Sequence, residues 1–273
     1  MNRRAKTANR IDEQHGDGAA DLRAHLVRAR LAGEVATSPQ ATVTNCTRLV
    51  AGHPEFTFGL SDWRSASLLE TVHAVQVLCG GDPGGDPPAG PGYIDPEATM
   101  AAIARHRDGV AALARTGGRV LLATGHPTGL LPHYATLARA LQAAGADLLM
   151  PLDDQAVHTA EDGRPRSVRF LDGVACVSDG GSLRHTHVAT YMEAMLDALG
   201  ATAPDLVIAD HGMAGAAIEA GIATLSIADV NDPALPLAQV RGRTDAVLPI
   251  DDNLAPSSFV PVTAAVLGGL AGR

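Results

Sequence analysis

The chain has 273 residues, of which 46% are hydrophobic and 19% charged, so it can bury a large core and does not resemble a disordered protein. Its formal net charge of -9 disfavours nucleic acid as a partner, because an acidic surface repels a phosphate backbone. The three cysteines, Cys46, Cys79 and Cys176, form no CxxC pair, which argues against a disulfide framework and against a zinc knuckle.

The N-terminal stretch "MNRRAKTANRIDEQHGDG" is basic but lacks the apolar segment of a secretory signal. No apolar run in the chain reaches the roughly 18 residues that a membrane-spanning helix needs. We therefore expect a cytoplasmic protein with reduced thiols and no membrane partner, and a homo-oligomer is compatible with the sequence. We expect residues 1–20 to form a mobile arm and residues 21–273 to form a single α/β domain.

Residues 21–94 are predicted to be the helical and loop-rich N-terminal part of that domain. Apolar residues at helical spacing predict helices over 21–31, 46–49 and 67–78. The segment "EFTFGL", residues 55–60, predicts a short strand. Glycine and proline dominate residues 80–93, which predicts a loop that is either a plain surface linker or a lid over a site.

Residues 95–273 show the regular alternation of a Rossmann-like core. Asp95 as a cap and Pro96 as the first residue predict the start of its first helix. The predicted helices cover 96–115, 130–144, 188–199, 214–220 and 258–267, and the predicted strands cover 119–125, 146–152, 205–209, 222–228 and 245–250. Strands that are apolar throughout indicate a mainly parallel sheet with helices on both faces. Asp172-Gly173, between two alternating runs, predicts a small antiparallel hairpin insertion.

Polar residues follow four of these strands. They are Thr124 with Gly125, Asp210 with His211, the segment from Asp229 to Asp232, and the segment from Asp251 to Asn253. Ligands of open parallel sheets bind beyond the carboxyl ends of the strands, so we expect one polar rim there. The two copies of Ile-Ala-Asp would then direct the carboxylates of Asp210 and Asp229 into a shared crevice. The alternative is that each aspartate only caps its own turn or helix.

Two parts of this rim suggest bound ions. Alternation in an extended turn places Asp229 and Asn231 on one side, and such oxygen ligands suit magnesium, manganese or calcium better than zinc. A cluster of acidic groups also repels itself unless a cation or protonation offsets the charge. After Asp210 and His211, the small residues of "GMAGAA" leave backbone amides open at a helix start, which favours anions.

The turn "ATGHPTGL" is neither a Walker loop nor a GxGxxG fingerprint. Its backbone amides at Gly125 and the hydroxyls of Thr124 and Thr128 still form a candidate phosphate cradle. His126 is a candidate acid or anion contact, and the alternative is a histidine that merely stands at a helix start.

His185 and His187 are two residues apart, so an extended chain directs both rings to one side. Some metal hydrolases use this spacing, whereas the alternative is a pair of histidines lining a polar cleft. Arg184 is a candidate for gripping a phosphate or carboxylate. No GxSxG elbow occurs and no cysteine stands in an electropositive setting, which disfavours a covalent serine or cysteine mechanism.

Several of these motifs together resemble an actinobacterial family labelled "phosphatase". They are "ATGHPTGLLPHYATLARALQAAGADLL", "HTHVATYMEAML", "LVIADHGMAGAAIEAGI", "ADVNDPAL" and "LPIDDN". The resemblance runs from about residue 22 to residue 267. The family is distantly similar to the metal-dependent damage-control phosphatases and the D-glutamate cyclase group. That similarity implies a Rossmann-like core in which Asp and Asn hold a divalent cation beside a phosphate or carboxylate.

The resemblance also implies site residues. An Asn-rich N-terminal element of the family matches Asn45, and its His-Pro-x-Gly turn matches the segment from His126 to Gly129. Its paired histidines match His185 and His187. Its Asp-His-Gly turn matches the segment from Asp210 to Gly212, and its Asn-Asp-Pro turn matches the segment from Asn231 to Pro233.

Our leading hypothesis is a metal-dependent phosphatase acting on a small phosphorylated metabolite. A magnesium or manganese ion held by Asp210, Asp229 and Asn231 would polarise the phosphoryl group and position water. The catalytic residues would be His126, His211 and Asp210, with a histidine moving the proton. The residues expected to bind substrate are Asn45, Thr124, Gly125, Thr128, Arg184, His185, His187 and Asp232. The alternatives are a lyase or cyclase acting on a carboxylated small molecule at the same metal site, and a ligand-binding domain without catalysis.

Overall fold

The central sheet has nine strands in the part of the chain that the computed structural model describes, residues 18–160 and 162–270. Its main path runs in the order β11-β10-β9-β3-β7-β6-β5, with β4 also paired to β3 and β8 to β7. The strands are β3 (Arg119–Ala123), β4 (Asp147–Leu148), β5 (Ala156–Thr159), β6 (Pro165–Leu171), β7 (Val174–Ser178), β8 (Leu183–Arg184), β9 (Leu206–Asp210), β10 (Thr224–Ala228) and β11 (Val247–Pro249). The five strands from β11 to β7 are parallel neighbours, so the predicted α/β class with a mainly parallel sheet is confirmed.

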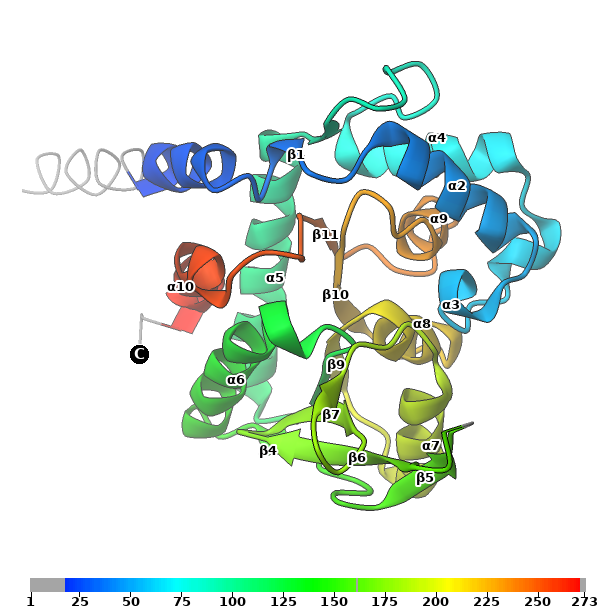
Figure 1. Cartoon of the computed structure of the whole chain (residues 1–273). Helices are drawn as coiled ribbons and strands as arrows, with labels where there is room; N and C mark the ends of the chain where they lie inside the picture. The colour runs from blue at the N-terminus through cyan, green and yellow to red at the C-terminus, as the bar shows by residue number, and fades with distance from the viewer. Residues whose placement is uncertain (1–17, 161, 271–273) are drawn as a thin grey trace, which may run out of the picture.

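Helices cover both faces of this sheet (Figure 1). On one side lie α5 (Pro96–Thr116), α6 (Pro127–Ala143) and α10 (Val260–Leu267), and on the other α7 (Thr190–Leu199), α8 (His211–Glu219) and α9 (Ala234–Val240). Every residue of β7, β9 and β10 is buried, as expected for strands covered on both faces. Short 3-10 turns cover Asp62–Ser65, Gly200–Thr202, Pro256–Phe259 and Gly268–Leu270.

The predicted hairpin is confirmed and is continuous with the main sheet. Strands β6 and β7 pair antiparallel around Asp172 and Gly173, whose φ angles of 49° and 81° suit a tight two-residue turn. Strand β7 also pairs in parallel with β3 at Leu122 and Ala123. The first half of the same edge of β3 pairs with β4. The hairpin therefore extends the sheet outward and places the segment after β8 above the end of β3.

The N-terminal part packs around the edge of the sheet that carries the ends of β10 and β11. Residues 18–28 are helical, and residues 1–17 of the predicted mobile arm lie outside the described residues. The other elements are β1 (Gly33–Val35), α2 (Pro39–Val50), α3 (Pro54–Thr57), α4 (Leu68–Cys79) and β2 (Gly92–Ile94), and β1 pairs antiparallel with β2. The Asp251 N–H donates to the Leu31 carbonyl, at 2.9 Å, which ties the start of the chain to the end of β11.

The strand predicted over residues 55–60 is wrong. Pro54 occupies the first turn of α3, and the backbone then turns sharply because Phe58 and Gly59 both have positive φ angles, 53° and 79°. Proline at a helix start and two left-handed residues after it favour a single helical turn over an extended strand. Thr57, Phe58 and Leu60 are buried in this turn, so the apolar residues of the segment reach the core without an extended strand.

Several helix starts differ from the predicted ones by two or three residues. Ser67 and Asp95 cap α4 and α5 by accepting hydrogen bonds from Glu70 N–H and Glu97 N–H, as predicted for Asp95. Helices α6 and α8, however, each begin three residues earlier than the apolar pattern predicts, at Pro127 and His211. Helix α2 is also longer than the predicted 46–49, and α9 was not predicted. The earlier starts place polar residues of the rim in the first helical turns.

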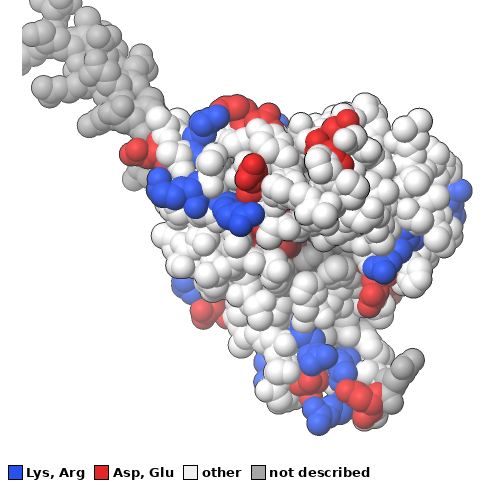
Figure 2. All heavy atoms as spheres, turned by 45° about the horizontal axis from the view of Figure 1, so that its top comes forward, with Lys and Arg blue, Asp and Glu red and all other residues white. Residues whose placement is uncertain are grey.

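The surface in Figure 2 shows cationic and acidic side chains lying among one another near the first helix and at the end formed by the hairpin. Two ion pairs of the hairpin region illustrate this mixture: Arg166 lies 2.8 Å from Asp162 and Arg169 lies 2.7 Å from Asp154. No helix within residues 18–160 and 162–270 is both long and apolar enough to cross a membrane.

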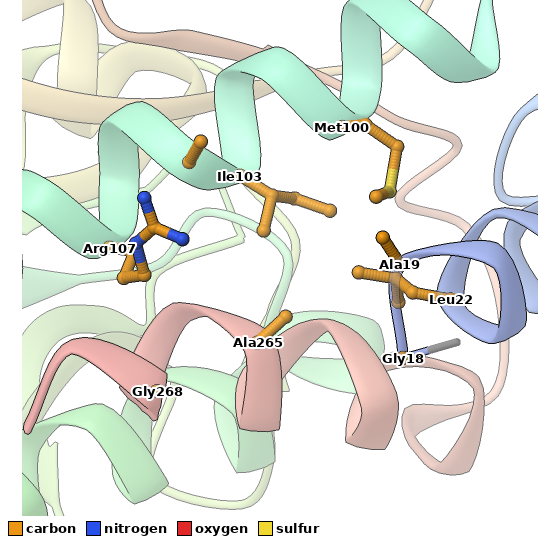
Figure 3. A pocket seen from close by; sticks show the side chains of 9 residues that line it. Gly18, Ala19, Leu22, Met100, Ile103, Arg107, Ala265 and Gly268 are labelled. Atoms are coloured by element: carbon orange, nitrogen blue, oxygen red, sulfur yellow. The ribbon is translucent and has the colours of Figure 1, made fainter. Parts of the chain in front are cut away.

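A pocket of about 440 Å³ lies between the first helix, α5 and α10 (Figure 3). Its lining is mostly apolar and includes Leu22, Met100, Ile103 and Ala265, with Arg107 at one end. None of its lining residues was predicted to belong to the functional site.

The three cysteines are buried. Burial raises the pKa of Cys46 and of Cys176 to about 12, which makes these thiols poor nucleophiles.

Two buried histidines away from the rim hold the neutral form. His106 Nε2 donates to the Ala246 carbonyl at 2.9 Å, and His133 Nδ1 donates to the Thr263 hydroxyl oxygen at 2.7 Å. Burial lowers the pKa of His106 to about 4 and that of His133 to about 3. Because an unfolded histidine titrates near pH 6.5, their full contribution to stability is present above that pH and is lost as the pH falls toward 4 and 3.

We expect His106→Gln to flatten the acid dependence of stability. Glutamine keeps a side-chain N–H donor but takes up no proton, so the free energy of unfolding should fall less steeply between pH 6.5 and 4, by about 1.4 kcal/mol per pH unit. Urea unfolding at several pH values measures both slopes. The exposed His73→Gln is the control and should keep the wild-type slope. Identical slopes for His106→Gln and wild type would contradict the assignment.

Candidate functional site

The carboxyl ends of β3, β9, β10 and β11 lie along one edge of the sheet because these strands are parallel neighbours. Side chains that follow them meet there with two histidines from the segment after β8. We call this group the rim cluster; its members are His126, His185, His187, His211, Asp210, Asp232 and Asp252. Six of the seven were predicted site residues. We expected the ends of different strands to bring their polar residues together, and these side chains do lie together.

Asp210 and His211 form the buried centre of the rim cluster. Asp210 ends β9 and is fully buried, and its Oδ1 accepts hydrogen bonds from Gly125 N–H at 2.7 Å and from His211 Nδ1 at 2.8 Å. Since a carboxylate only accepts, His211 Nδ1 carries a proton, and Nε2 is the ring atom left to hold a second proton or a metal. His211 has a positive φ of 47° at the first residue of α8, which turns its ring back over the strand end.

The Nε2 atom of His211 is directed toward two more carboxylates. Its Nε2 lies 3.6 Å from Oδ2 of Asp232 and 3.6 Å from Oδ2 of Asp252. Both aspartates are at most 4% exposed, and Oδ2 of Asp252 and Oδ2 of Asp210 have no hydrogen-bond partner among the described residues. Buried carboxylates without partners need a positive charge beside them.

The pKa values of this group show how strongly the charges interact. Burial lowers the pKa of His211, but the charge of Asp232 and the hydrogen bond to Asp210 outweigh burial and raise it to about 10. Burial raises the pKa of Asp232 to about 6. Burial also raises the pKa of Asp252, but the hydrogen bond from His126 and the charge of His211 outweigh it and hold that pKa below the usual range. The site therefore attracts a proton or a metal cation at the Nε2 atom of His211.

His126 connects this centre to the start of α6. Its Nδ1 lies 3.3 Å from Oδ1 of Asp252, and its backbone N–H donates to the hydroxyl of Thr124 at 2.9 Å. Thr124 and Gly125 thus use their polar groups within the protein, since Gly125 also accepts a hydrogen bond from Thr186 N–H at 2.9 Å. Thr128 is exposed in the first turn of α6, where the positive end of the helix dipole favours an anion.

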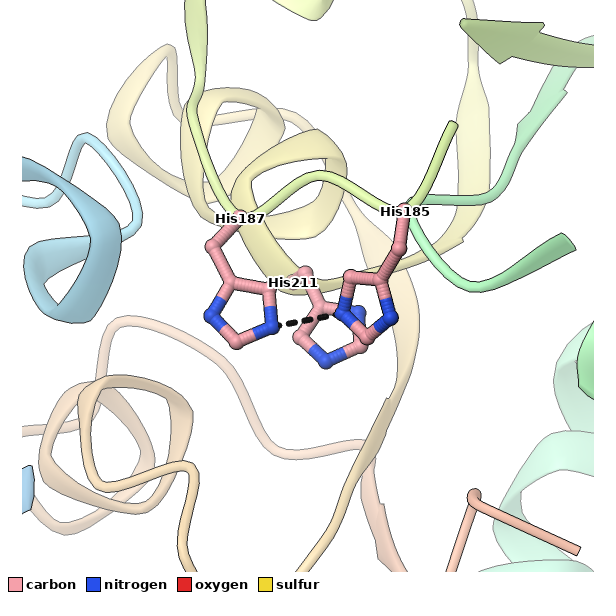
Figure 4. A group of neighbouring side chains, drawn as sticks. All are labelled: His185, His187 and His211. Carbon is pink, nitrogen blue, oxygen red and sulfur yellow. Dashed lines mark hydrogen bonds between the residues drawn. The ribbon is translucent and has the colours of Figure 1, made fainter. Parts of the chain in front are cut away.

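His185 and His187 approach the centre from the segment after β8 (Figure 4). Their Nε2 atoms lie 2.7 Å apart, and His187 Nδ1 contacts the Glu55 carbonyl at 3.2 Å. The ring of His187 stacks on that of His211, with centroids 4.4 Å apart and planes at 12°. Burial, and then the charge of His211, lower the pKa of His185 to about 4 and that of His187 to about 3, so both rings favour the neutral form that binds metals.

Other predicted site residues lie at the rim but use their side chains in internal bonds. Asp229 accepts hydrogen bonds from Val230 N–H at 2.7 Å and from the Thr37 hydroxyl at 2.9 Å. Asn45 donates from Nδ2 to the backbone carbonyl of Asn231 at 2.9 Å. The exposed Arg184 on β8 lies 3.7 Å from Oδ2 of Asp179.

Two groups of His, Cys, Asp and Glu residues could hold a metal ion within the described residues. One consists of His185, His187 and His211, and the other of His211, Asp232 and Asp252. In each group the candidate ligand atoms lie within 4.8 Å of one another. Asp210 and Asp229, which the sequence suggested as ligands, belong to neither group. Asp210 instead accepts a hydrogen bond from His211, a member of both groups, and a carboxylate behind a metal-binding histidine usually has this place.

Asp252 was placed at the predicted rim but was not assigned a role in the site. It follows the predicted strand over 245–250, so the rule that placed Asp210 and Asp229 at the rim also covers it. Phe58 was missed as well: its ring lies edge-on to His187 and His211, with centroids 5.5 Å and 5.4 Å away. The incorrect strand prediction over 55–60 concealed that contact.

Glycines allow the segment from Thr186 to Val188 to lie directly on two strand ends. A Cβ atom at Gly125 would stand 2.3 Å from the Thr186 carbonyl oxygen, and one at Gly212 would stand 2.3 Å from the His187 carbonyl oxygen. Real Cβ atoms do not approach backbone so closely. Gly212, in the stretch "GMAGAA" that the sequence suggested as an anion site, therefore allows this close packing.

We expect Gly212→Ala to lower the free energy of unfolding by about 1–3 kcal/mol, because the added methyl group must displace the backbone at His187 and Val188. Urea unfolding monitored by circular dichroism measures the change. Gly268→Ala is the matched control, since a Cβ there meets nothing within 4 Å, and it should leave stability nearly unchanged. Equal stability of the two variants would show that the segment does not rest on α8 in this way.

Comparison with known proteins adds two matches. The profile of a family described as Phosphatase matches residues 17–271, a range that includes every member of the rim cluster. The chain is also similar to Phosphatase SCO2771 of Streptomyces coelicolor, with 38% identity over 255 residues. That alignment covers 91% of this chain and 94% of the relative.

Proposed function

This chain belongs to the Phosphatase family, and from that premise we propose that it hydrolyses phosphate monoesters of small metabolites with a divalent cation bound by His211, Asp232 and Asp252. The resemblance suggested by the sequence motifs is confirmed at the level of the family. The cation, its ligands and the class of ester are the proposal.

One observation carries the cation site: the Nε2 atom of His211 lies 3.6 Å from an oxygen of Asp232 and from an oxygen of Asp252. The bond from Nδ1 to Asp210 fixes the tautomer that leaves this Nε2 free to bind a metal. Two carboxylates suit magnesium or manganese, and an added imidazole nitrogen is better tolerated by manganese. The unpartnered Oδ2 of Asp252 is the donor that such an ion would satisfy.

A cation bound there supplies Lewis-acid polarisation of a phosphoryl oxygen and a more acidic water. The residues of this chain do the rest. The start of α6 at Pro127 directs its positive end toward the rim, where Thr128 is open to solvent and a phosphate group can meet it. His185 is the most exposed histidine of the rim cluster and lines the approach for the ester.

His126 is placed to move the proton in this reaction. Its Nδ1 faces Asp252, which orients the ring and stabilises its protonated form. The other ring nitrogen, Nε2, is then the atom that donates a proton to the leaving oxygen of the ester. Asp210 has a different task, because it is fully buried behind His211 and holds that ring in place.

Release of phosphate from a panel of sugar and nucleoside phosphates tests the proposal. We expect turnover of some of these esters, loss of it after treatment with EDTA, and recovery when manganese or magnesium is added back. Turnover that EDTA leaves untouched would contradict the role of the cation. No phosphate release from any ester, with the metal supplied, would contradict the phosphatase assignment for this chain.

A further inference from the structure

Helix α2 passes beside the rim cluster and carries an arginine near it. Its Asn45 donates from Nδ2 to the backbone carbonyl of Asn231 at 2.9 Å, and the next residue, Asp232, belongs to the rim cluster. Arg48 follows Asn45 by three residues, and side chains at this spacing are neighbours on the surface of a helix. Arg48 therefore lies about one turn along α2 from a residue that contacts the site.

Phe56 and His187 connect Arg48 to the centre of the rim cluster. The guanidinium carbon of Arg48 lies 5.0 Å from the centroid of the Phe56 ring, which is a cation–π contact. The Phe56 ring lies edge-on to His187, with centroids 6.4 Å apart, and His187 stacks on His211. Helix α3, which contains Phe56, contacts both α2 and α8 (Figure 1). Arg48 is thus held at the α3 end of the cluster.

The start of α6 lies at the other end of the same cluster. His126 immediately precedes α6, and its ring centroid lies 4.5 Å from that of His185. His187, in contrast, lies against α3, where its Nδ1 contacts the Glu55 carbonyl at 3.2 Å. The rim cluster therefore extends from a helix start that favours an anion to the guanidinium of Arg48.

The charge of Arg48 is available to a ligand. Arg48 is exposed, and it forms no ion pair with a carboxylate of residues 18–160 or 162–270. Arg241 and Arg243, in contrast, both pair with Asp62. Stacking on Phe56 uses the flat face of the guanidinium and leaves the N–H donors at its edge, whose fork matches a phosphate group. Arg48 is therefore a pre-positioned contact for an anion.

We propose that Arg48 binds a second phosphate of the substrate, so that the protein prefers sugar-sized esters with a phosphate at each end. This inference rests on the proposed function, because the first phosphate is the one that meets the cation and the start of α6. The rings of His187 and Phe56 lie between the two anion contacts, so an ester with a body of one or two carbons does not reach both.

Steady-state release of phosphate from fructose bisphosphate and from fructose monophosphate, with manganese supplied, tests the proposal. In wild type we expect a lower KM for the bisphosphate. Arg48→Gln should raise the KM for the bisphosphate by about 10- to 100-fold, the cost of losing a hydrogen bond between charged groups, and should leave the KM for the monophosphate nearly unchanged. Arg48→Lys keeps the charge but not the fork, so its KM for the bisphosphate should lie between those of wild type and Arg48→Gln.

Arg64→Gln is the matched control. Arg64 is also exposed and stacks on an aromatic ring, that of Trp63, with 5.5 Å from the guanidinium carbon to the centroid. Within the described part of the chain, the Trp63 ring contacts no histidine of the rim cluster. Arg64→Gln should therefore keep the wild-type KM for both esters.

An unchanged KM for the bisphosphate in Arg48→Gln, or the same change for both esters, would overturn the role of Arg48. The second result would show that Arg48 only packs on Phe56. The ester panel judges the proposed function separately. If neither fructose ester is hydrolysed, titration of the manganese-loaded protein with fructose bisphosphate decides on Arg48 alone. Affinity at least about 10-fold weaker in Arg48→Gln would support the inference, and equal affinity would overturn it.

Discussion

Replacing Asp252 with asparagine should lower kcat/KM for phosphate ester hydrolysis about a thousandfold. The Oδ2 of this buried carboxylate lies 3.6 Å from His211 Nε2, and its Oδ1 lies 3.3 Å from His126 Nδ1. Asp252→Asn therefore removes a proposed cation ligand and the group that would orient the proposed proton donor. A metal ion contributes several kcal/mol to stabilising a phosphoryl transition state, and about 4 kcal/mol corresponds to that loss in rate.

The adjacent Asp251 supplies the matched control. It is also buried, but its Oδ1 accepts a hydrogen bond from Asn253 N–H, and it belongs to neither candidate metal group. Asp251→Asn should therefore keep kcat/KM close to that of wild type. Steady-state kinetics on a substrate from the ester panel measure both variants. Equal losses in the two variants, or no loss in Asp252→Asn, would remove Asp252 from the site.

The variant Asp210→Asn should weaken cation binding by about 10- to 100-fold, the usual cost of losing the outer carboxylate of a metal-binding histidine. Asparagine fills the same space, and its oxygen can still accept the bond from Gly125 N–H. It lacks the charge that fixes the His211 tautomer and makes Nε2 a better donor. Isothermal titration with manganese measures the affinity directly.

Activity measured at increasing manganese concentration distinguishes a positioning role for Asp210 from a merely structural one. If Asp210 acts through His211, a large excess of manganese should restore most of the activity of Asp210→Asn, whereas a damaged fold would not respond. Asp229→Asn is the comparison, because Asp229 occupies the equivalent place after β10 but bonds to Val230 and Thr37. It should bind manganese nearly as well as wild type. A stronger loss there than in Asp210→Asn would favour the ligands suggested by the sequence.

Much of the fold could be predicted because the buried strands are apolar and the helices between them have clear spacing. The errors fall where local pattern and tertiary packing disagree. Helices α6 and α8 begin inside polar and glycine-containing turns, so the apolar spacing shows only their later residues. The pairing of β7 with β3 joins segments about 50 residues apart, which no local pattern reports.

The site was predictable to the level of the sheet edge. The strand-end rule brought Asp210, His211 and Asp232 together, and the spacing of His185 and His187 indicated a shared direction. The rule could not tell which carboxylates remain free of hydrogen bonds within the protein. The sequence suggested Asp229 as a ligand because its hydrogen-bond partner could not be recognised. That partner, Thr37, is 192 positions away in the chain, and no local pattern reveals the bond.

The bonds from Thr37 to Asp229 and from Asn45 to Asn231 join the beginning of the chain to residues near its end. A ribosome therefore releases the N-terminal helices long before their partners exist. Phe58, which is buried against two histidines of the rim cluster, has no such contacts until α8 has been synthesised. An enzyme truncated during translation before β10 would therefore have an exposed apolar surface and an incomplete candidate site.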